Sequence, residues 1–322
     1  MIAAEVRERV RAGGLLFGRS AVVAMLSGGR DSVCLLDLAV ALRGAEQVLA
    51  LHVNYGLRAE SDEDERHCRE LCERFKVEIE ILRAGREAGA VGNIHAWARE
   101  VRYGAAMTLA EKRDAIVATG HTASDQVETI LYRLAASPGR RALLGMPASD
   151  GRLVRPLLGL ARDATAAYCL ERSLAWREDV SNDSVEYARA RVRHGLLRAL
   201  DEVHPAAQAN VLRTAELLRE ETEVLDGLVD GLLDGRSSIE IERLSSLPSA
   251  LRRLVVIRLA EDATGAFVPQ AGERVEEILA LAARGGRAEL HIGGLAGAVI
   301  ENGELRMVKI APREQRPERS GQ

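Results

Sequence analysis

The sequence predicts an α/β protein with a doubly wound, mostly parallel sheet, followed by a smaller C-terminal α+β domain. Three observations support this prediction. Short apolar runs alternate with amphipathic stretches over the first 120 residues. The chain has 322 residues, which is more than one small core usually organises. After residue 138 the pattern changes to a loop-rich connection and then to a run of helical patterns.

Four apolar runs have the length of buried strands, and each is bounded by glycine, charged or turn residues. They are AVVAML (21–26), VLALHV (48–53), VEIEIL (77–82) and AIVAT (115–119). Helical patterns separate them at 32–43, 62–75 and 94–112, and a helix over 123–136 follows the fourth run. Strands that alternate with helices indicate βαβ units, and therefore a parallel sheet with right-handed crossovers.

The second half of the chain predicts a different organisation. After the loop-rich stretch 137–151, the segments 160–174 and 185–200 are expected to be helices, and a further helical run begins at Pro205 and reaches about residue 234. We expect a linker at 235–246. The remaining elements are helices at 249–262 and 270–284, short strands joined by an Asn302-Gly303 hairpin turn, and a disordered tail over 312–322.

The composition excludes several classes of protein. Apolar residues make up 47% and charged residues 29% of the chain, which argues against a disordered or collagen-like protein. No stretch approaches ~18 uncharged apolar residues, so we expect neither a membrane-spanning helix nor a membrane partner. The net charge of −4 argues against non-specific coating of DNA, and any contact with nucleic acid needs a local basic patch.

The N-terminus and the cysteines indicate a cytoplasmic protein. MIAAEVRERVRAGG has no apolar h-region and no cleavage site, so no signal peptide is expected. The four cysteines, Cys34, Cys68, Cys72 and Cys169, fit a reduced interior better than a disulfide framework. Cys68 and Cys72 lie one helical turn apart, but no second pair completes a zinc site, so we expect them in the core.

The motif that carries chemistry follows the first predicted strand. It is the run Ser27, Gly28, Gly29, Arg30, Asp31 and Ser32, and a helix begins there. A glycine-rich turn at a helix N-terminus presents backbone N–H groups to an anion, and the serines add hydroxyl donors. Asp31 would repel a phosphate unless a cation lay between them, which indicates Mg²⁺. No Gly-Lys-Ser/Thr sequence is present, so the loop is not a Walker loop.

The pattern SGGxDS after a first strand resembles the PP-loop of the ATP pyrophosphatase superfamily. That resemblance implies an adenine nucleotide alpha hydrolase-like fold, ATP and Mg²⁺ as cofactors, and adenylation of a carbonyl oxygen with release of pyrophosphate. A glycine turn with a helix-capping Asp or Ser is the alternative interpretation of so short a match.

Five further segments in order resemble the tRNA(Ile)-lysidine synthetase family, in its short form. They are HVNYGLRAES (52–61), NIHAWAREVRYGAA (93–106), the His-block GHTASDQVETILYRLAASPGRRALLGM (120–146), RPLL (155–158) and WREDVSNDSVEYARARVRHGLLRAL (176–200). Three positions depart from the family pattern. Tyr55 stands where His is usual, Ser124 replaces the first acid of the His-block, and Ala190 replaces an Asn.

The resemblance implies a two-step ligase reaction that forms a C–N bond. ATP would activate the wobble cytidine of the CAU anticodon of tRNA(Ile), and the ε-amine of L-lysine would then attack, giving lysidine, AMP and pyrophosphate. We accordingly expect a catalytic ATP-binding domain over 1–204 and a tRNA-binding helical or α+β domain over 205–311. The sequence leaves the oligomeric state open, a homodimer included.

The resemblance also assigns candidate residues. Asp31, Arg102 and Asp125 are the catalytic candidates, and Asp31 with Asp125 would hold Mg²⁺. The nucleotide would contact residues 27–32, His52 and His121, the last at the carboxyl edge of the sheet where open α/β sheets bind ligands. The candidates for contact with tRNA or substrate are Arg99, Arg140, Arg141, Arg189, Arg193 and Glu128. Solvated helix faces are the alternative for the arginines, and an ordinary loop histidine for His121.

Three other functions stay open at this stage. A PP-loop enzyme that inserts sulfur into tRNA would need catalytic or cluster-binding cysteines, and no Cys-x-x-Cys is present. A small-molecule ligase of the same superfamily would not need the segment 176–200 or the C-terminal helical domain. A non-catalytic RNA-binding relative is suggested only by Ser124.

Overall fold

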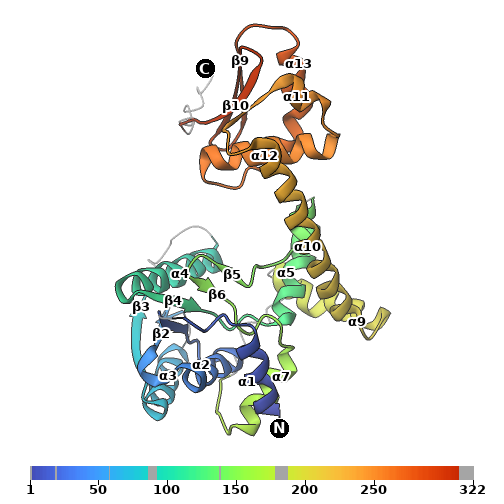
Figure 1. The fold of residues 1–322 in the computed structure, drawn as a ribbon. Coiled ribbons are helices and arrows are strands. Elements are labelled where there is room, and N and C mark those ends of the chain that lie inside the picture. Colours follow the sequence, from blue (N-terminus) through green and yellow to red (C-terminus); the bar gives the residue numbers. More distant parts are fainter. Residues whose placement is uncertain are drawn as a thin grey trace, which may run out of the picture. The chain divides into compact units, whose positions relative to one another are not determined.

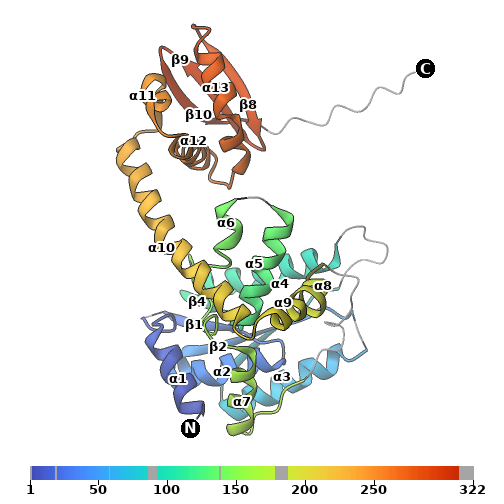
Figure 2. The same cartoon turned by 90° about the vertical axis from the view of Figure 1, so that its right-hand side faces the viewer.

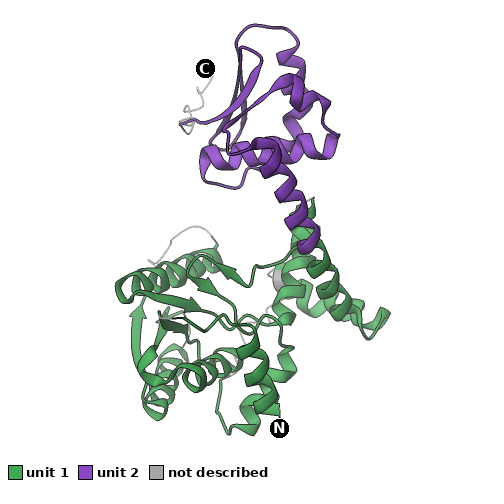
Figure 3. Ribbon diagram, in the orientation of Figure 1, with its two compact units in different colours: residues 1–218 green, residues 219–322 purple. Residues whose placement is uncertain are grey.

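The structure is a computed structural model that describes residues 2–18, 20–57, 59–85, 93–137, 139–177 and 188–311. The chain divides into two compact units, residues 1–218 and 219–322 (Figure 3). The functional boundary predicted at residue 204 stays a prediction. The expected disordered tail at 312–322 lies outside the described residues.

A six-stranded sheet forms the centre of the first unit, in the order β3-β2-β1-β4-β6-β5. Its strands are β1 (Ala21–Met25), β2 (Val48–Asn54), β3 (Glu78–Arg83), β4 (Ala115–Ala118), β5 (Ser149–Asp150) and β6 (Leu153–Val154). All neighbours pair in parallel except β5, which runs antiparallel to β6. The predicted fold class is therefore confirmed. The last two strands have two residues each, which is too short to show a period-2 pattern in the sequence.

Helices cover both faces of this sheet (Figure 1). On one face, α1 (Ile2–Ala12), α2 (Arg30–Arg43), α3 (Ser61–Phe75) and α7 (Arg162–Glu171) share a buried cluster with the strands. On the other face, α4 (Ile94–Arg113) contributes Ala106 and Ala110 to a cluster with β1, β2, β4 and β6. Alternate residues of a strand point to opposite faces, so Val22 and Ala24 join the first cluster and Val23 and Met25 the second.

A helical group completes the first unit. It consists of α5 (Ala123–Ala136), α6 (Arg140–Leu143), α8 (Ala188–Arg191), a π-helical turn (Val192–Leu196), α9 (Leu197–Val203) and the first part of α10 (Ala207–Leu233). Figure 2 shows α5 beside α8 and α9. Val127 and Leu131 of α5 form a small core with Val192 and Leu197, and Val211 packs against it. The helix predicted at 185–200 agrees with this over its described residues, from 188 onwards.

The second unit is an antiparallel sheet packed against helices. The strand order is β7-β10-β9-β8, from β7 (Ser238–Glu240), β8 (Ala288–Gly293), β9 (Ala296–Glu301) and β10 (Glu304–Lys309). The helices are α11 (Ile241–Ser246), α12 (Ser249–Thr264), a 3-10 turn (Pro269–Arg274) and α13 (Val275–Ala282). Asn302 and Gly303 have φ values of +53° and +79°, as the predicted hairpin turn requires.

One prediction in the second unit is wrong. The stretch 235–246 is not a linker, because Ile239 pairs with Leu305 of β10 and Leu244 is fully buried in the core. The charged residues of this stretch obscure a three-residue strand and a six-residue helix whose apolar residues point inwards. Among the described residues, no helix is long and apolar enough to cross a membrane.

Candidate active site

The glycine-rich loop joins β1 to α2 in a conformation that needs its first glycine. Gly28 has a φ of +82°, a region that favours glycine, and a Cβ there would lie 3.3 Å from the Cys68 sulfur. Ser32 Oγ donates to the Gly29 carbonyl (2.7 Å) and accepts from the Ser27 amide (3.2 Å). The hydroxyls therefore fix the loop, while the first amides of α2, at Arg30 and Asp31, point out of the helix end without an intrahelical partner.

Asp31, in the first turn of α2, is surrounded by donors. It accepts a hydrogen bond from Thr165 Oγ1 of α7, and its carboxylate oxygens lie 3.4 Å from Arg30 Nε and 3.9 Å from Arg162 Nε. Its side chain is 20% exposed. The structure thus holds a half-buried carboxylate beside the anion-binding amides, with arginines supplying the positive charge.

Gly120 brings the end of β4 against the start of α2. A Cβ on this residue would lie 3.0 Å from the backbone carbon and oxygen of Asp31 and 3.1 Å from the Ser32 nitrogen. A side chain at this position would have to push the α2 backbone away by a few tenths of an ångström, so Gly120 favours the short distance between the glycine-rich loop and the His121 turn. Sequence reasoning did not single out Gly120, although its place between a strand and a histidine was the available signal.

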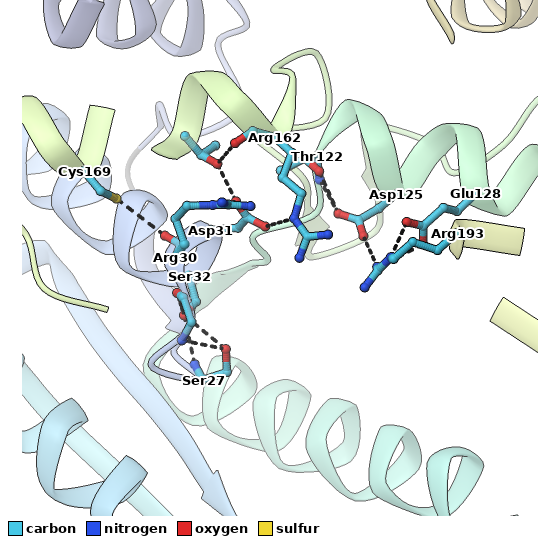
Figure 4. Close-up of polar contacts among 12 residues, drawn as sticks. Ser27, Arg30, Asp31, Ser32, Thr122, Asp125, Glu128, Arg162, Cys169 and Arg193 are labelled. Carbon is cyan, nitrogen blue, oxygen red and sulfur yellow. Dashed lines mark hydrogen bonds and ion pairs between the residues drawn. The ribbon is translucent and has the colours of Figure 1, made fainter. Parts of the chain in front are cut away.

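Asp125 begins α5 as one half of a capping box. Its Oδ2 accepts from the Thr122 amide and from Thr122 Oγ1, both at 2.8 Å, and its Oδ1 lies 3.7 Å from Arg193 Nη2. Figure 4 shows the Asp31 and Asp125 carboxylates each facing an arginine, Arg162 and Arg193. Among the described residues, no group of three or more His, Cys, Asp or Glu side chains forms a metal site. Two carboxylates fit Mg²⁺, which proteins usually bind through one or two carboxylates together with substrate phosphates.

Glu128 and Arg193 bind each other. Glu128 is buried on α5, and the Arg193 fork meets its two oxygens at 2.6 and 3.0 Å. The two predicted substrate or tRNA residues are therefore paired with each other, and their contact with substrate stays a prediction. The pairing joins residues 65 positions apart, and the local sequence pattern holds no signal for it.

His121 follows β4 at the carboxyl edge of the sheet, as predicted. Its Nδ1 lies 2.8 Å from Thr119 Oγ1. Burial lowers the pKa of His121 to about 4, the charge of Asp125 opposes that shift, and the charges of Arg155, Arg102 and Arg99 add to it. The imidazole is consequently neutral near pH 7, within reach of the negative charge of Asp125 and of the positive charges of three arginines.

The basic group lies on α4 and after β6. Arg99 stacks over the Tyr103 ring at 4.5 Å, and Arg102 lies 5.6 Å from the same ring centroid. Arg102 Nε is buried and has no partner among the described residues. The structure therefore brings Arg99 and Arg102 to one tyrosine. Arg155, which was not predicted as a site residue, acts with them on the charge of His121.

His52 is buried in β2, 4% exposed, behind the glycine-rich loop. Its Nδ1 lies 2.9 Å from the Leu26 carbonyl and 3.3 Å from Cys68 Sγ, and burial lowers its pKa. Its Nε2 has no partner within the part of the chain that is described. These contacts hold Leu26, the residue before Ser27, in place. Contact of His52 with a nucleotide stays a prediction.

The other predicted arginines lie in two places. Arg140 and Arg141 lie in α6, after the end of α5, and Arg140 Nη1 is buried without a partner among the described residues. Arg189 belongs to α8, and its side chain falls outside the described part. Arg162 and Thr165 of α7 are site residues that the sequence did not reveal, because nothing local links α7 to Asp31.

The comparisons with known proteins give the family and the fold. Residues 3–200 match a family described as a PP-loop domain. A tRNA(Ile)-lysidine synthase of Pseudomonas fluorescens is 37% identical over 230 residues, which are 69% of this chain and 49% of that protein. One of Rhodococcus erythropolis is 36% identical over 260 residues, 77% of this chain and 76% of that protein.

A solved U34-tRNA thiolase of Methanococcus maripaludis has the same fold, with a TM-score of 0.57 at 18% identity over 68% of this chain and 79% of that one. The fold, the loop and these matches define a PP-loop ATP-binding protein. Within that class, the chain belongs to the tRNA(Ile)-lysidine synthase family. It spans about half the length of the Pseudomonas relative.

Proposed function

We propose that the chain attaches L-lysine to the wobble cytidine of a tRNA(Ile) with a CAU anticodon, in an ATP-dependent reaction that forms lysidine, AMP and pyrophosphate. The observation that carries the proposal is the pair Asp31 and Asp125 beside the PP-loop, at the carboxyl edge of the parallel sheet. Family membership supports the substrates. Since the three substrates and three products are cytoplasmic molecules, the cytoplasm is the proposed location.

In the first step the 2-carbonyl oxygen of the cytidine attacks the α-phosphorus of ATP and pyrophosphate leaves. The α2 amides and the hydroxyls of Ser27 and Ser32 bind the phosphates and stabilise the charge that grows on them. Mg²⁺, when bound, supplies further positive charge, and Asp31 and Asp125 are the residues that would hold it. Arg30 and Arg162 keep Asp31 in place.

In the second step the lysine ε-amine attacks the activated carbon and AMP leaves. The amine must lose a proton, and Asp125 is the proposed acceptor because Arg193 binds Glu128 at two points and is more distant, at 3.7 Å, from Asp125. His121 stays neutral beside it and adds no charge that would repel an ammonium group. Arg102, whose Nε has no partner among the described residues, is the proposed contact for the departing phosphate.

The tRNA needs a basic surface and an unstacked wobble base. We assign Arg99, Arg140, Arg141 and Arg189 to contacts with its backbone, and Arg193 to the positioning of Asp125 and Glu128. Sulfur insertion is disfavoured because Cys34, Cys68, Cys72 and Cys169 are all buried. The second unit is proposed to bind another part of the tRNA.

The test is incorporation of labelled lysine into a tRNA(Ile) transcript with a CAU anticodon. We expect incorporation that requires both ATP and Mg²⁺ and disappears in Asp31→Ala. Asp114→Asn, which removes the charge of an exposed acid after α4 at a left-handed position that asparagine tolerates, is the control and should keep full activity. A folded, ATP-binding protein that incorporates no lysine would contradict the proposal.

A further inference from the structure

Arg155 occupies a position at the sheet edge that the proposed reaction has not yet used. It follows β6 directly, and β6 lies next to β4, where Ala118 pairs with Val154 and the Thr119 amide donates to the Val154 carbonyl (3.1 Å). Arg155 therefore lies at the carboxyl edge of the sheet, alongside the turn that carries His121. This is the edge at which open parallel sheets bind their ligands.

The Arg155 guanidinium is buried without a counter-ion. The residue is 5% exposed, its Nη1 donates to the Pro147 carbonyl (2.7 Å), and its Nε has no acceptor among the described residues. No carboxylate of the described residues lies within ion-pair distance of it. Burial lowers the Arg155 pKa, the positive charges of Arg99 and Arg133 add to that effect, and Tyr103 and Asp150 oppose it. A buried cation is costly to a fold unless a partner neutralises it.

Tyr103 presents a second unused donor to the same place. Its hydroxyl is buried and has no partner within the described part of the chain. Tyr103 packs in the cluster that contains Leu153, and a strand directs residues two apart to the same face. Arg155 follows β6 two residues after Leu153, and Tyr103 is among the groups close enough to act on its charge. One cation and one hydroxyl converge there, and no carboxylate of the described part of the chain forms an ion pair with Arg155.

We infer that Arg155 and Tyr103 form the subsite for the α-carboxylate of the free amino acid substrate. A guanidinium and a hydroxyl are donors suited to an oxyanion, and Arg binds carboxylates at two points. A phosphodiester of the tRNA has the same chemistry, but it continues into nucleotides on both sides and needs an open groove. A 5% exposed arginine is reached by the end of a small molecule.

This assignment rests on the proposed function and adds a specificity determinant to it. With the carboxylate at Arg155, the amino acid would enter on the basic side of His121. Its amine would then be free to extend towards Asp125 on the acidic side. Arg155 would select lysine over amines of equal length that have no carboxylate.

The test compares lysine with cadaverine, which is lysine without its carboxylate, in wild type, Arg155→Gln and Tyr103→Phe. We expect the wild type to prefer lysine and Arg155→Gln to raise the KM for lysine about 10- to 100-fold, the range of a lost charge-assisted hydrogen bond. The kcat/KM for cadaverine and the KM values for ATP and tRNA should not change. Tyr103→Phe removes only a hydroxyl without a partner, so it should fold normally and show a smaller effect in the same direction.

Three outcomes would overturn the inference. A raised KM for tRNA with unchanged KM for lysine would assign the subsite to a phosphodiester. An equal loss of kcat/KM for lysine and for cadaverine would show that Arg155 has a structural role. An unchanged preference for lysine over cadaverine in both variants would show that Arg155 and Tyr103 do not recognise the amino acid. If Arg155→Gln fails to fold, the result for Tyr103→Phe decides. The proposed function fails separately, when wild type incorporates no lysine at all.

Discussion

Arg193 binds Glu128 at two points and lies 3.7 Å from Asp125, so one guanidinium contacts two acids one turn apart on α5. Arg193 belongs to a π-helical turn, a distortion that is frequent at functional sites. Glu128 is 6% and Arg193 24% exposed at the side chain. The Arg193–Glu128 pair therefore connects the helices after residue 188 to α5, which carries Asp125, the proposed proton acceptor.

Glu128→Gln should destabilise the protein because it leaves a largely buried arginine without its main counter-charge. We expect a loss of about 1–3 kcal/mol in the free energy of unfolding, measured by urea denaturation. Glu216→Gln is the matched control, since Glu216 pairs with Arg213 on an exposed face and such pairs contribute ~0.5 kcal/mol. Equal losses in the two variants would show that the Arg193 pair adds nothing to stability.

Gly120→Ala should weaken ATP binding while leaving the protein folded. The new methyl group would press on the Asp31 backbone at 3.0 Å, and a backbone cannot rotate away as a flexible side chain can. We expect the Kd for ATP, measured by calorimetry, to rise about tenfold as the first turn of α2 shifts. Gly227→Ala on α10 meets nothing within 4 Å and should leave ATP binding unchanged. Wild-type affinity in Gly120→Ala would show that the loop tolerates the shift.

The depressed pKa of His121 predicts a loss of stability in mild acid. The folded value is about 4, below the ordinary value of 6.5. Between about pH 6.5 and 4, His121 is protonated in the unfolded chain and neutral in the folded chain. The contribution of His121 to the free energy of unfolding is therefore full above pH 6.5 and is lost as the pH falls towards 4. His121→Asn should show a shallower fall of unfolding free energy across this window than wild type. His204→Asn, at an exposed histidine, should keep the wild-type slope.

Much of the fold could be predicted because its elements follow strict periods. The runs at 21–26, 48–53, 77–82 and 115–119 became β1 to β4, and no end is shifted by more than one residue. The stretch 137–151 was predicted as loop-rich, yet it holds α6 and β5, since elements of four and two residues contain less than one useful period. The same limit explains the missed strand β7.

Site residues could be predicted where they lie in one continuous segment of the chain. They could not be predicted where the site combines residues from several segments. The loop 27–32 and the position of His121 follow from local sequence. The Thr165 contact with Asp31 spans 134 residues, and the Arg193 contact with Glu128 spans 65. Such pairings depend on how helices pack, which a single sequence does not record.

A chain ending at residue 218 should bind ATP as the full chain does and lose lysine transfer to tRNA. Val211 and Leu212 on the first part of α10 pack against the cluster of Val127 and Leu131, so this cut keeps the core of the first unit. A chain ending at 205 lacks those two side chains. It should unfold at a lower temperature, because Val211 and Leu212 are partly buried and even full burial of one aliphatic side chain contributes about 1.5–3 kcal/mol.

The measurements are ATP affinity by calorimetry, melting temperature, and lysine incorporation at several tRNA concentrations. If the second unit binds tRNA, the chain ending at 218 should regain part of its activity when the tRNA concentration is raised, since its chemistry is intact and only affinity is lost. Full activity at low tRNA concentration would exclude a tRNA-binding role for residues 219–311. Lost ATP affinity would instead show that the first unit depends on the rest of α10 for its fold.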